Sequence, residues 1–403
     1  MRATSVRCLC ALASFGILLP MPVGRAAQDP PRQPTFKSGV ELVVVDAQVV
    51  DKKKGDPIPD LKSDAFQVTI DGKKRKVSSL QFIHAASGQP QSPEGNAGLP
   101  VRSGNIYVIA VDQGSFRAVN APSVMYATRE FLKRVHANDY VGMISYPAPG
   151  VRINPTRDRK VFEEAIPKLV GFSQLKQDRR YQYNLSEAID VAARDPEALR
   201  RVSERNCPGN DPMCARSIET EMNELVSMLE LQGARSFHGL REVVSAMRGI
   251  EGRTTLVLMS AGIPTGDRSG GRLYLRNDAV QAGKDGQGSS LLIYTLHLNT
   301  AFLDAFSPDA PSAQQTALRD SGVFSRGLDL FNGAAGGTFF EVNTGANFAI
   351  DRIVREMSAY YLLGVEVDDV DRDGRAHLIQ LKVNAKDSAV RNRASVIIPK
   401  RGT

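Results

Sequence analysis

The segment that decides the fold follows Asn105 and reads Ile106-Tyr107-Val108-Ile109-Ala110-Val111-Asp112. An almost continuous apolar run of this length is typical of a central strand that is buried on both faces. Similar runs recur at residues 141–145, 255–259 and 291–296, and segments with helical spacing alternate with them. Strands that alternate with helices form a mainly parallel sheet covered on both sides. The sequence therefore predicts an α/β fold from residue 105 onward.

Helices are predicted from apolar spacing and from helix-starting residues. Pro122 is expected in the first turn of a helix, where its missing amide hydrogen costs nothing. The buried stripe of this helix is expected to be Val124, Thr128, Phe131, Leu132 and Val135. Residues 174–233 are expected to form a largely helical insertion, with one apolar face made of Ile218, Met222, Leu225, Val226 and Leu229. Residues 337–340 precede a last predicted helix around residues 348–357.

The two ends of the mature chain have the alternating pattern of β structure. Residues 38–84 predict a small β domain and residues 364–403 a β extension. Residues 85–104 are rich in Ser, Gly, Pro and Gln, and so predict a linker. Residues 27–37 predict a flexible lead-in.

The first 26 residues predict export. Arg2 and Arg7 precede an apolar run at residues 8–19, and small residues follow around Ala26. This is the pattern of a secretory signal peptide, and the run is shorter than the roughly 20 apolar residues that span a bilayer. No later segment is long and apolar enough to span one. We expect a periplasmic or extracellular protein with no transmembrane segment in its mature chain.

Charge gives little reason to expect nucleic acid as a partner. The formal net charge of the whole chain is +7, and it falls to about +4 without the three arginines of residues 1–26. The two basic patches, residues 52–54 and 73–76, flank the turn formers Gly55-Asp56 and Asp71-Gly72. We expect solvated hairpin tips there; an anionic partner or membrane surface is the alternative.

Only Cys207 and Cys214 remain after removal of the signal peptide. They bracket a loop of turn-forming residues, and the chain is expected to fold in an oxidising compartment. A structural disulfide is therefore predicted. The five histidines fall in no metal-ligand spacing, which disfavours a cysteine and histidine metal site.

Several segments together resemble a known family. In order and spacing they resemble the secreted bacterial proteins with a VWFA-related domain, a divergent branch of the von Willebrand factor A superfamily. The resemblance covers nearly all of the mature chain. It rests on Val45-Asp46, Gly55, residues 60–72, Val111-Asp112, residues 252–262, residues 336–340, residues 360–364 and His377. It implies a Rossmann-like von Willebrand factor A type domain over residues 105–363, between a small N-terminal β domain and a C-terminal β extension.

The resemblance also implies where a metal site would lie, and the sequence departs from it there. The superfamily binds a divalent cation through Asp-x-Ser-x-Ser after the first strand, together with a threonine and a second aspartate. Here the motif holds Gly114 and Phe116 at its two serine positions, and residues 260–262 contain no carboxylate. Magnesium demands near-ideal oxygen geometry, so we expect no firmly bound ion. Asp112 with Ser115 or Asp267 is a weak candidate for magnesium.

A second weak metal candidate is the segment Asp369-Val370-Asp371-Arg372-Asp373-Gly374, which matches the start of a calcium-binding loop. The twelfth position holds Gln380 where that loop needs a bidentate glutamate. The sequence favours a β-hairpin turn at Asp373-Gly374, with a loose surface calcium site through Asp369, Asp371 and Asp373 as the alternative.

The sequence predicts a binding protein and not an enzyme. It has no nucleophile elbow, metalloprotease motif or phosphate loop, and a pairing of Ser260 with His297 or His238 is the weak basis for a hydrolase. Open α/β sheets bind ligands at the carboxyl ends of their strands. The first hypothesis is therefore a metal-independent binding or adhesion module for a protein or envelope component, and the alternative is a structural or assembly role. The binding residues are expected to be Asp112, Gln113, Ser115, Phe116, Ser260 and Asp267, with an exposed Phe116 as the anchor and Ile263 and Arg268 as further contacts.

Overall fold

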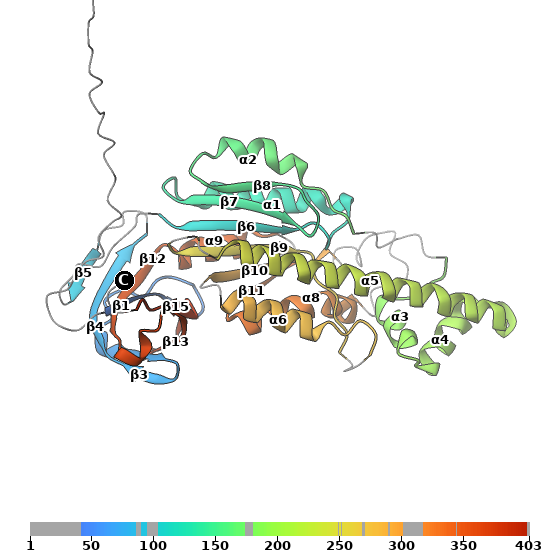
Figure 1. The fold of residues 1–403 in the computed structure, drawn as a ribbon. Coiled ribbons are helices and arrows are strands. Elements are labelled where there is room, and N and C mark those ends of the chain that lie inside the picture. Colours follow the sequence, from blue (N-terminus) through green and yellow to red (C-terminus); the bar gives the residue numbers. More distant parts are fainter. Residues whose placement is uncertain are drawn as a thin grey trace, which may run out of the picture. The chain divides into compact units, whose positions relative to one another are not determined.

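The run at residues 106–112 forms strand β6, Ile106–Asp112, inside a six-stranded sheet in the computed structural model of the chain (Figure 1). The structure describes residues 42–85, 90–94, 104–173, 180–248, 250, 252–267, 271–288, 291–300, 317–343 and 345–400. The strand order is β11-β10-β9-β6-β7-β8, parallel throughout except that β8 runs antiparallel to β7. The other strands are β7 Tyr140–Tyr146, β8 Arg152–Thr156, β9 Thr254–Ser260, β10 Leu292–Leu298 and β11 Thr338–Val342. The predicted α/β class is confirmed, and the edge strand β8 is an addition to it.

Helices cover both faces of this sheet, as continuous apolar strands require. One face packs on α1 Ala121–Arg134, α2 Lys160–Ala165 and α9 Asn347–Glu356, and this core contains Phe131 and Ile350. The other face packs on α6 Arg276–Gln287, α8 Ala317–Ala335 and the second half of α5 Pro212–Ala246. Pro122 lies in the first turn of α1, where it was expected.

The predicted helical insertion does not end near residue 233, because α5 continues through that point for 35 residues in all (Figure 1). Its first half packs on α3 Leu185–Ala192 and α4 Pro196–Asn206 in a separate core. The predicted apolar face of α5 is confirmed, since all its members are buried: Ile218, Met222, Leu225, Val226 and Leu229. The Sγ atoms of Cys207 and Cys214 lie 2.04 Å apart, so the predicted pairing is confirmed.

The β segments from the two ends of the chain share two sheets instead of forming separate parts. The first sheet has the order β14-β1-β12-β4-β5 and the second β15-β13-β2-β3. The first contains β1 Leu42–Asp51, β4 Val77–His84, β5 Pro90–Glu94, β12 Ala359–Glu366 and β14 Ser388–Asn392. The second contains β2 Phe66–Ile70, β3 Lys73–Arg75, β13 Ala376–Val383 and β15 Ser395–Ile397. Strand β12, from the end of the predicted α/β domain, lies between β1 and β4 because its apolar run packs in the core of these sheets.

Turn glycines explain some of the segments that carry the family resemblance. Gly55 has φ +77°, and a Cβ there would meet Arg352 Nε at 2.8 Å. Arg352 in turn donates to the carbonyl oxygens of Lys52 and Lys53, and so holds the turn after β1 against α9. Asp71 and Gly72 both have positive φ and join β2 to β3, as predicted for this hairpin.

A buried ion cluster joins the β sheets to the amino-terminal edge of the central sheet. Glu356, at the end of α9, is fully buried; it accepts hydrogen bonds from Tyr294 Oη and Arg352 Nε, both at 2.9 Å. Asp46 of β1 pairs with Arg253 and Arg393. The guanidinium of Arg253 also lies 3.8 Å from the centre of the Tyr360 ring. This cluster links residues that lie up to about 350 positions apart in the chain.

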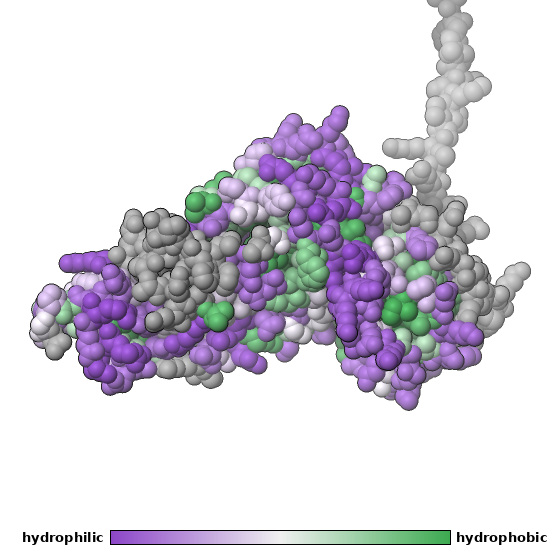
Figure 2. Space-filling view, turned by 180° about the vertical axis from the view of Figure 1, so that it is seen from behind, coloured by the Kyte–Doolittle hydropathy of each residue, from purple (hydrophilic) through white to green (hydrophobic). Residues whose placement is uncertain are grey.

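The surface carries both basic patches as expected, since Lys52, Lys53, Lys54, Lys73 and Lys74 are exposed. The face in Figure 2 is mainly hydrophilic, with hydrophobic atoms gathered in separate patches. No described helix combines the length and the apolar character needed to cross a membrane. The predicted signal peptide and lead-in, residues 1–37, lie outside the described residues.

Candidate functional site

The carboxyl edge of the central sheet contains a topological switch point at β6. The chain places β7 on one side of β6 and β9 on the other, and ligands of open α/β sheets bind at such a point. Asp112 ends β6 and Ser260 ends β9, so both residues lie at the edge where they were expected. Their environment, however, differs from the one expected for a binding surface.

Asp112 is fully buried and its carboxylate is already occupied. Oδ1 accepts a hydrogen bond from Ser236 Oγ of α5, and Oδ2 accepts one from Ser260 Oγ, each at 3.0 Å. Burial raises the pKa of Asp112 to about 7, although these two hydroxyls and the amides of Gly114 and Ser115 act to lower it. The Asp112 side chain therefore joins strands β6 and β9 to helix α5, and its carboxylate is not free to bind a ligand at the switch point.

The residues present do not fit a magnesium ion at this position. Magnesium prefers several oxygen ligands, usually including a carboxylate that is free to coordinate it. The oxygens of Asp112 instead bind two hydroxyls, while Asp267 is exposed in the loop after β9. Among the residues that the structure describes, no three His, Cys, Asp or Glu side chains gather in a way that could hold a metal ion.

The expectation of an exposed Phe116 anchor is wrong. Phe116 is 1% exposed and belongs to the core beneath α1, because the loop after β6 turns this side chain inward. Gln113 and Ser115 are also buried, and Ser115 Oγ donates to the carbonyl of Asp112 while accepting from Ala261 N. Ile263 is buried too, and Arg268 lies outside the described residues. Of the predicted binding residues that the structure describes, only Asp267 is exposed.

A row of polar residues crosses the sheet at the level of Asp112. Strand register places Ser260 opposite His297, and His297 opposite Glu341. His297 is fully buried, and burial lowers its pKa to about 4. Ser260 donates its hydroxyl to Asp112, and His238 lies on α5 with Glu242 as its ion-pair partner at 3.7 Å. The residues named for a hydrolase thus form no exposed pair of nucleophile and base.

The predicted hairpin at Asp373-Gly374 is wrong, because β12 and β13 belong to different sheets and this segment crosses between them. Its carboxylates have protein partners. Asp371 accepts three hydrogen bonds from Arg75 at 2.8–2.9 Å, and Asp373 lies 3.0 Å from His377 Nε2. Asp369 pairs with Arg372 at 3.9 Å. These pairs replace the calcium ligation that the motif suggested.

An open groove lies beside the loop that follows Asp112. Its volume is about 530 Å³, and it lies between α5 and the loops that follow β6 and β7. Phe172, Met228 and Leu231 line it and remain 47%, 41% and 52% exposed. The other lining residues are Gly114, Pro147, Ala148, Gln232, Arg235 and His238. We call this feature the edge groove.

Close backbone packing places Phe172 in the edge groove. Phe172 N donates to Gln113 O at 2.8 Å and Ser173 N to Phe116 O at 3.0 Å. Gly171 permits this approach, since a Cβ there would lie 2.3 Å from the carbonyl oxygen of Phe116. Ser173 Oγ then donates to Gln232 Oε1, which connects this segment to α5. One wall of the groove is therefore supported by backbone hydrogen bonds.

Exposed apolar side chains recur around the same edge. Val119 precedes α1 after β6, and Phe348 lies in the first turn of α9 after β11. Val170 lies two residues before Phe172, which pairs with the loop after β6. Large apolar side chains gathered in this way mark an interaction surface more often than scattered ones do.

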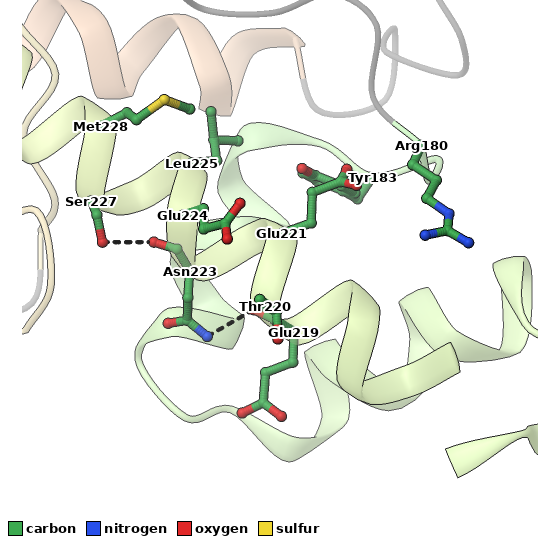
Figure 3. Close-up of a pocket in the computed structure, with 10 residues that line it drawn as sticks. All are labelled: Arg180, Tyr183, Glu219, Thr220, Glu221, Asn223, Glu224, Leu225, Ser227 and Met228. Carbon is green, nitrogen blue, oxygen red and sulfur yellow. Dashed lines mark hydrogen bonds between the residues drawn. The ribbon is translucent and has the colours of Figure 1, made fainter. Parts of the chain in front are cut away.

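A second cavity of about 930 Å³ lies further along α5 and is acidic (Figure 3). Glu219, Glu221 and Glu224 come from α5, and Arg180 and Tyr183 come from the segment before α3. Met228 lines this cavity and also the edge groove, so the two hollows adjoin along one helix.

The edge groove was not predicted from the sequence, although one signal for it was present. Met228, Leu231 and Arg235 follow each other at helical spacing, off the buried face that was recognised on α5. Their approach to Phe172 depends on tertiary packing and has no local signature. Comparison of the chain with protein-family models and with curated protein sequences finds no match in either, so the von Willebrand factor A resemblance stays a prediction.

Proposed function

We propose that this chain is an exported, non-enzymatic binding module of the von Willebrand factor A type, which recognises a protein or envelope partner through the edge groove without a metal ion. The observation that carries the proposal is the groove itself: three large apolar side chains remain about half exposed beside the switch point of an open α/β sheet. Burying such side chains against a partner contributes about 25 cal/mol per Å² of apolar surface.

Metal-independent binding is supported by the hydrogen bonds of Asp112, because its two carboxylate oxygens already accept from the hydroxyls of Ser236 and Ser260. Export is supported by the cysteine pair at bonding distance, since disulfides persist mainly outside the cytosol. We infer a periplasmic or extracellular location from this pair together with the signal-peptide pattern of residues 1–26.

The test is a cross-linked pull-down with tagged full chain from its native envelope fraction, read by mass spectrometry. Leu231→Asp should lose the partners captured by the wild type. Met213→Asp is the matched control, because Met213 is exposed on the same helix but does not line the groove. Equal capture by Leu231→Asp and wild type would refute the proposal, and so would loss of capture in EDTA alone.

A structural or assembly role is the second candidate, and a specific surface favours it. Ile397 is exposed in β15 at the edge of its sheet, and Val370 is exposed in the segment that joins β12 to β13. Edge strands with exposed apolar residues pair readily with other chains. Under this alternative, Ile397→Lys should abolish partner capture while Leu231→Asp leaves it intact.

A further inference from the structure

The charge of the exposed face of α5 changes along the helix, and the order of the charges indicates which ligand would fit. Glu224 lies at one end, Met228 and Leu231 follow, and Arg235 with His238 lies at the other end. The spacing of three, four and seven residues keeps Met228, Leu231 and Arg235 on one side of the helix. The surface is thus acidic, then apolar, then basic.

The basic end contains donors on Arg235 and Gln232 that lack an acceptor among the described residues, while His238 pairs with Glu242 at 3.7 Å. No hydrogen bond or ion pair engages the Arg235 side chain within the part of the chain that the structure describes. The neighbouring Gln232 uses Oε1 to accept from Ser173, while its buried Nε2 has no partner. A buried donor left unpaired costs about 1–3 kcal/mol. A ligand that supplies a carboxylate here gives the exposed Arg235 guanidinium an acceptor.

The acidic end of this face carries carboxylates that would pair with a cation. Glu224 is exposed and forms no ion pair with another described residue, and Glu219 and Glu221 line the same cavity (Figure 3). Eleven residues separate Glu224 from Arg235, which is about 16 Å along a helix axis. An extended peptide covers that distance in about five residues.

From this juxtaposition we propose that the edge groove binds an extended segment of a partner protein that carries a carboxylate and a cation about five residues apart, with apolar side chains between them. The carboxylate lies against Arg235 and Gln232, the apolar side chains pack on Phe172, Met228 and Leu231, and the cation faces Glu224. This inference rests on the proposed function and adds the chemical class of the partner.

The test is selection of random nine-residue peptides, displayed on phage, on the immobilised full chain. Enriched peptides should contain Asp or Glu about five positions from Lys or Arg, with apolar residues between. The most enriched peptide, synthesised with a fluorescent label, should bind Arg235→Glu at least about tenfold more weakly than wild type, the loss expected for one charge-assisted hydrogen bond. Exchange of its acidic residue for lysine should restore binding to Arg235→Glu.

Two variants serve as controls. Arg216→Glu makes the same charge change at an exposed position of α5 outside the groove and should bind as wild type does. Leu231→Ser should weaken binding, whereas Met213→Ser should not. Failure to enrich any peptide, enrichment without a carboxylate, or equal loss in Arg216→Glu would overturn this inference. If Leu231→Asp still loses its partners in the pull-down, the groove remains the binding site and only the ligand class is wrong.

Discussion

Removal of the Glu356 carboxylate should destabilise the whole chain, because this group joins the β sheets to the central sheet. Its side chain is fully buried, with Tyr294 and Arg352 donating to it at 2.9 Å and Arg391 Nε at 3.6 Å. Glu356→Ala leaves these donors without their acceptor. Breaking a buried ion pair from one side costs about 3–5 kcal/mol. We expect a loss of that size in the free energy of unfolding.

The Gln variant separates charge from shape. Glu356→Gln keeps the volume and one carbonyl oxygen, so it should lose about 1.5–3 kcal/mol, the range for hydrogen bonds to a charged group. Glu164→Ala is the control at an exposed position of α2 and should stay within about 0.5 kcal/mol of wild type.

Urea unfolding followed by far-ultraviolet circular dichroism measures all three variants, since the chain contains no tryptophan for fluorescence. A loss below about 1 kcal/mol for Glu356→Ala would show that the cluster is not a stabilising link.

Three further predictions concern the disulfide, the hydrogen-bonded carboxylate of Asp112 and the pKa of His377. Digestion without reducing agent should yield a peptide that links Cys207 to Cys214, and the double serine variant should lose at most about 2–3 kcal/mol because the loop is short; free thiols at both positions would contradict this. Partner affinity should be the same in EDTA and in millimolar magnesium, and a matching dependence on metal and on Asp112 would show that the site holds an ion after all. Burial acts to lower the pKa of His377, but hydrogen bonds with Asp71 and Asp373 raise it above its ordinary value of 6.5 overall. The folded state therefore holds the proton more tightly, so this stabilisation is complete below pH 6.5 and is lost as the pH rises through the folded-state pKa. His377→Gln should remove that part of the pH dependence of unfolding, and an unchanged dependence would refute it.

The predictions from sequence succeeded where a local pattern determines the structure. The strand at residues 106–112, the start of α1 near Pro122 and the buried face of α5 all depend on apolar spacing and on turn chemistry. Pairing over long distances has no such pattern. The apolar run of strand β12 is compatible with either domain. It belongs to the first of the two β sheets because Tyr361 and Leu363 pack in the core of those sheets.

Phe116 failed as a predicted anchor for a related reason. The family resemblance placed it in a loop that is open to ligands, and an exposed phenylalanine in such a loop would make a good contact. Whether a loop side chain turns outward or inward depends on what lies beneath it. Here the core under α1 accepts the ring, and Gly171 brings the backbone of the next segment directly onto Phe116.

Helix α5 lies close to the loop after β6. This contact accounts both for the hydrogen-bonded Asp112 carboxylate and for the position of the edge groove. Gly114 allows that approach, since a Cβ there would meet Ser236 Oγ at 3.1 Å and Pro147 Cδ at 3.0 Å. Ser236 can then reach Asp112 and occupy the oxygen that a metal would need. The same approach brings the next turns of α5, with Leu231 and Arg235, beside Pro147 and Phe172, where they line an open groove. A serine at position 114 would place its Cβ 3.0–3.1 Å from Pro147 and Ser236, so these neighbours would have to shift by a few tenths of an ångström. We expect this substitution to weaken the hydrogen bond from Ser236 to Asp112 and to reduce partner affinity in the adjoining groove, measured against wild type in EDTA; an unchanged affinity would contradict the link between the loop and the groove.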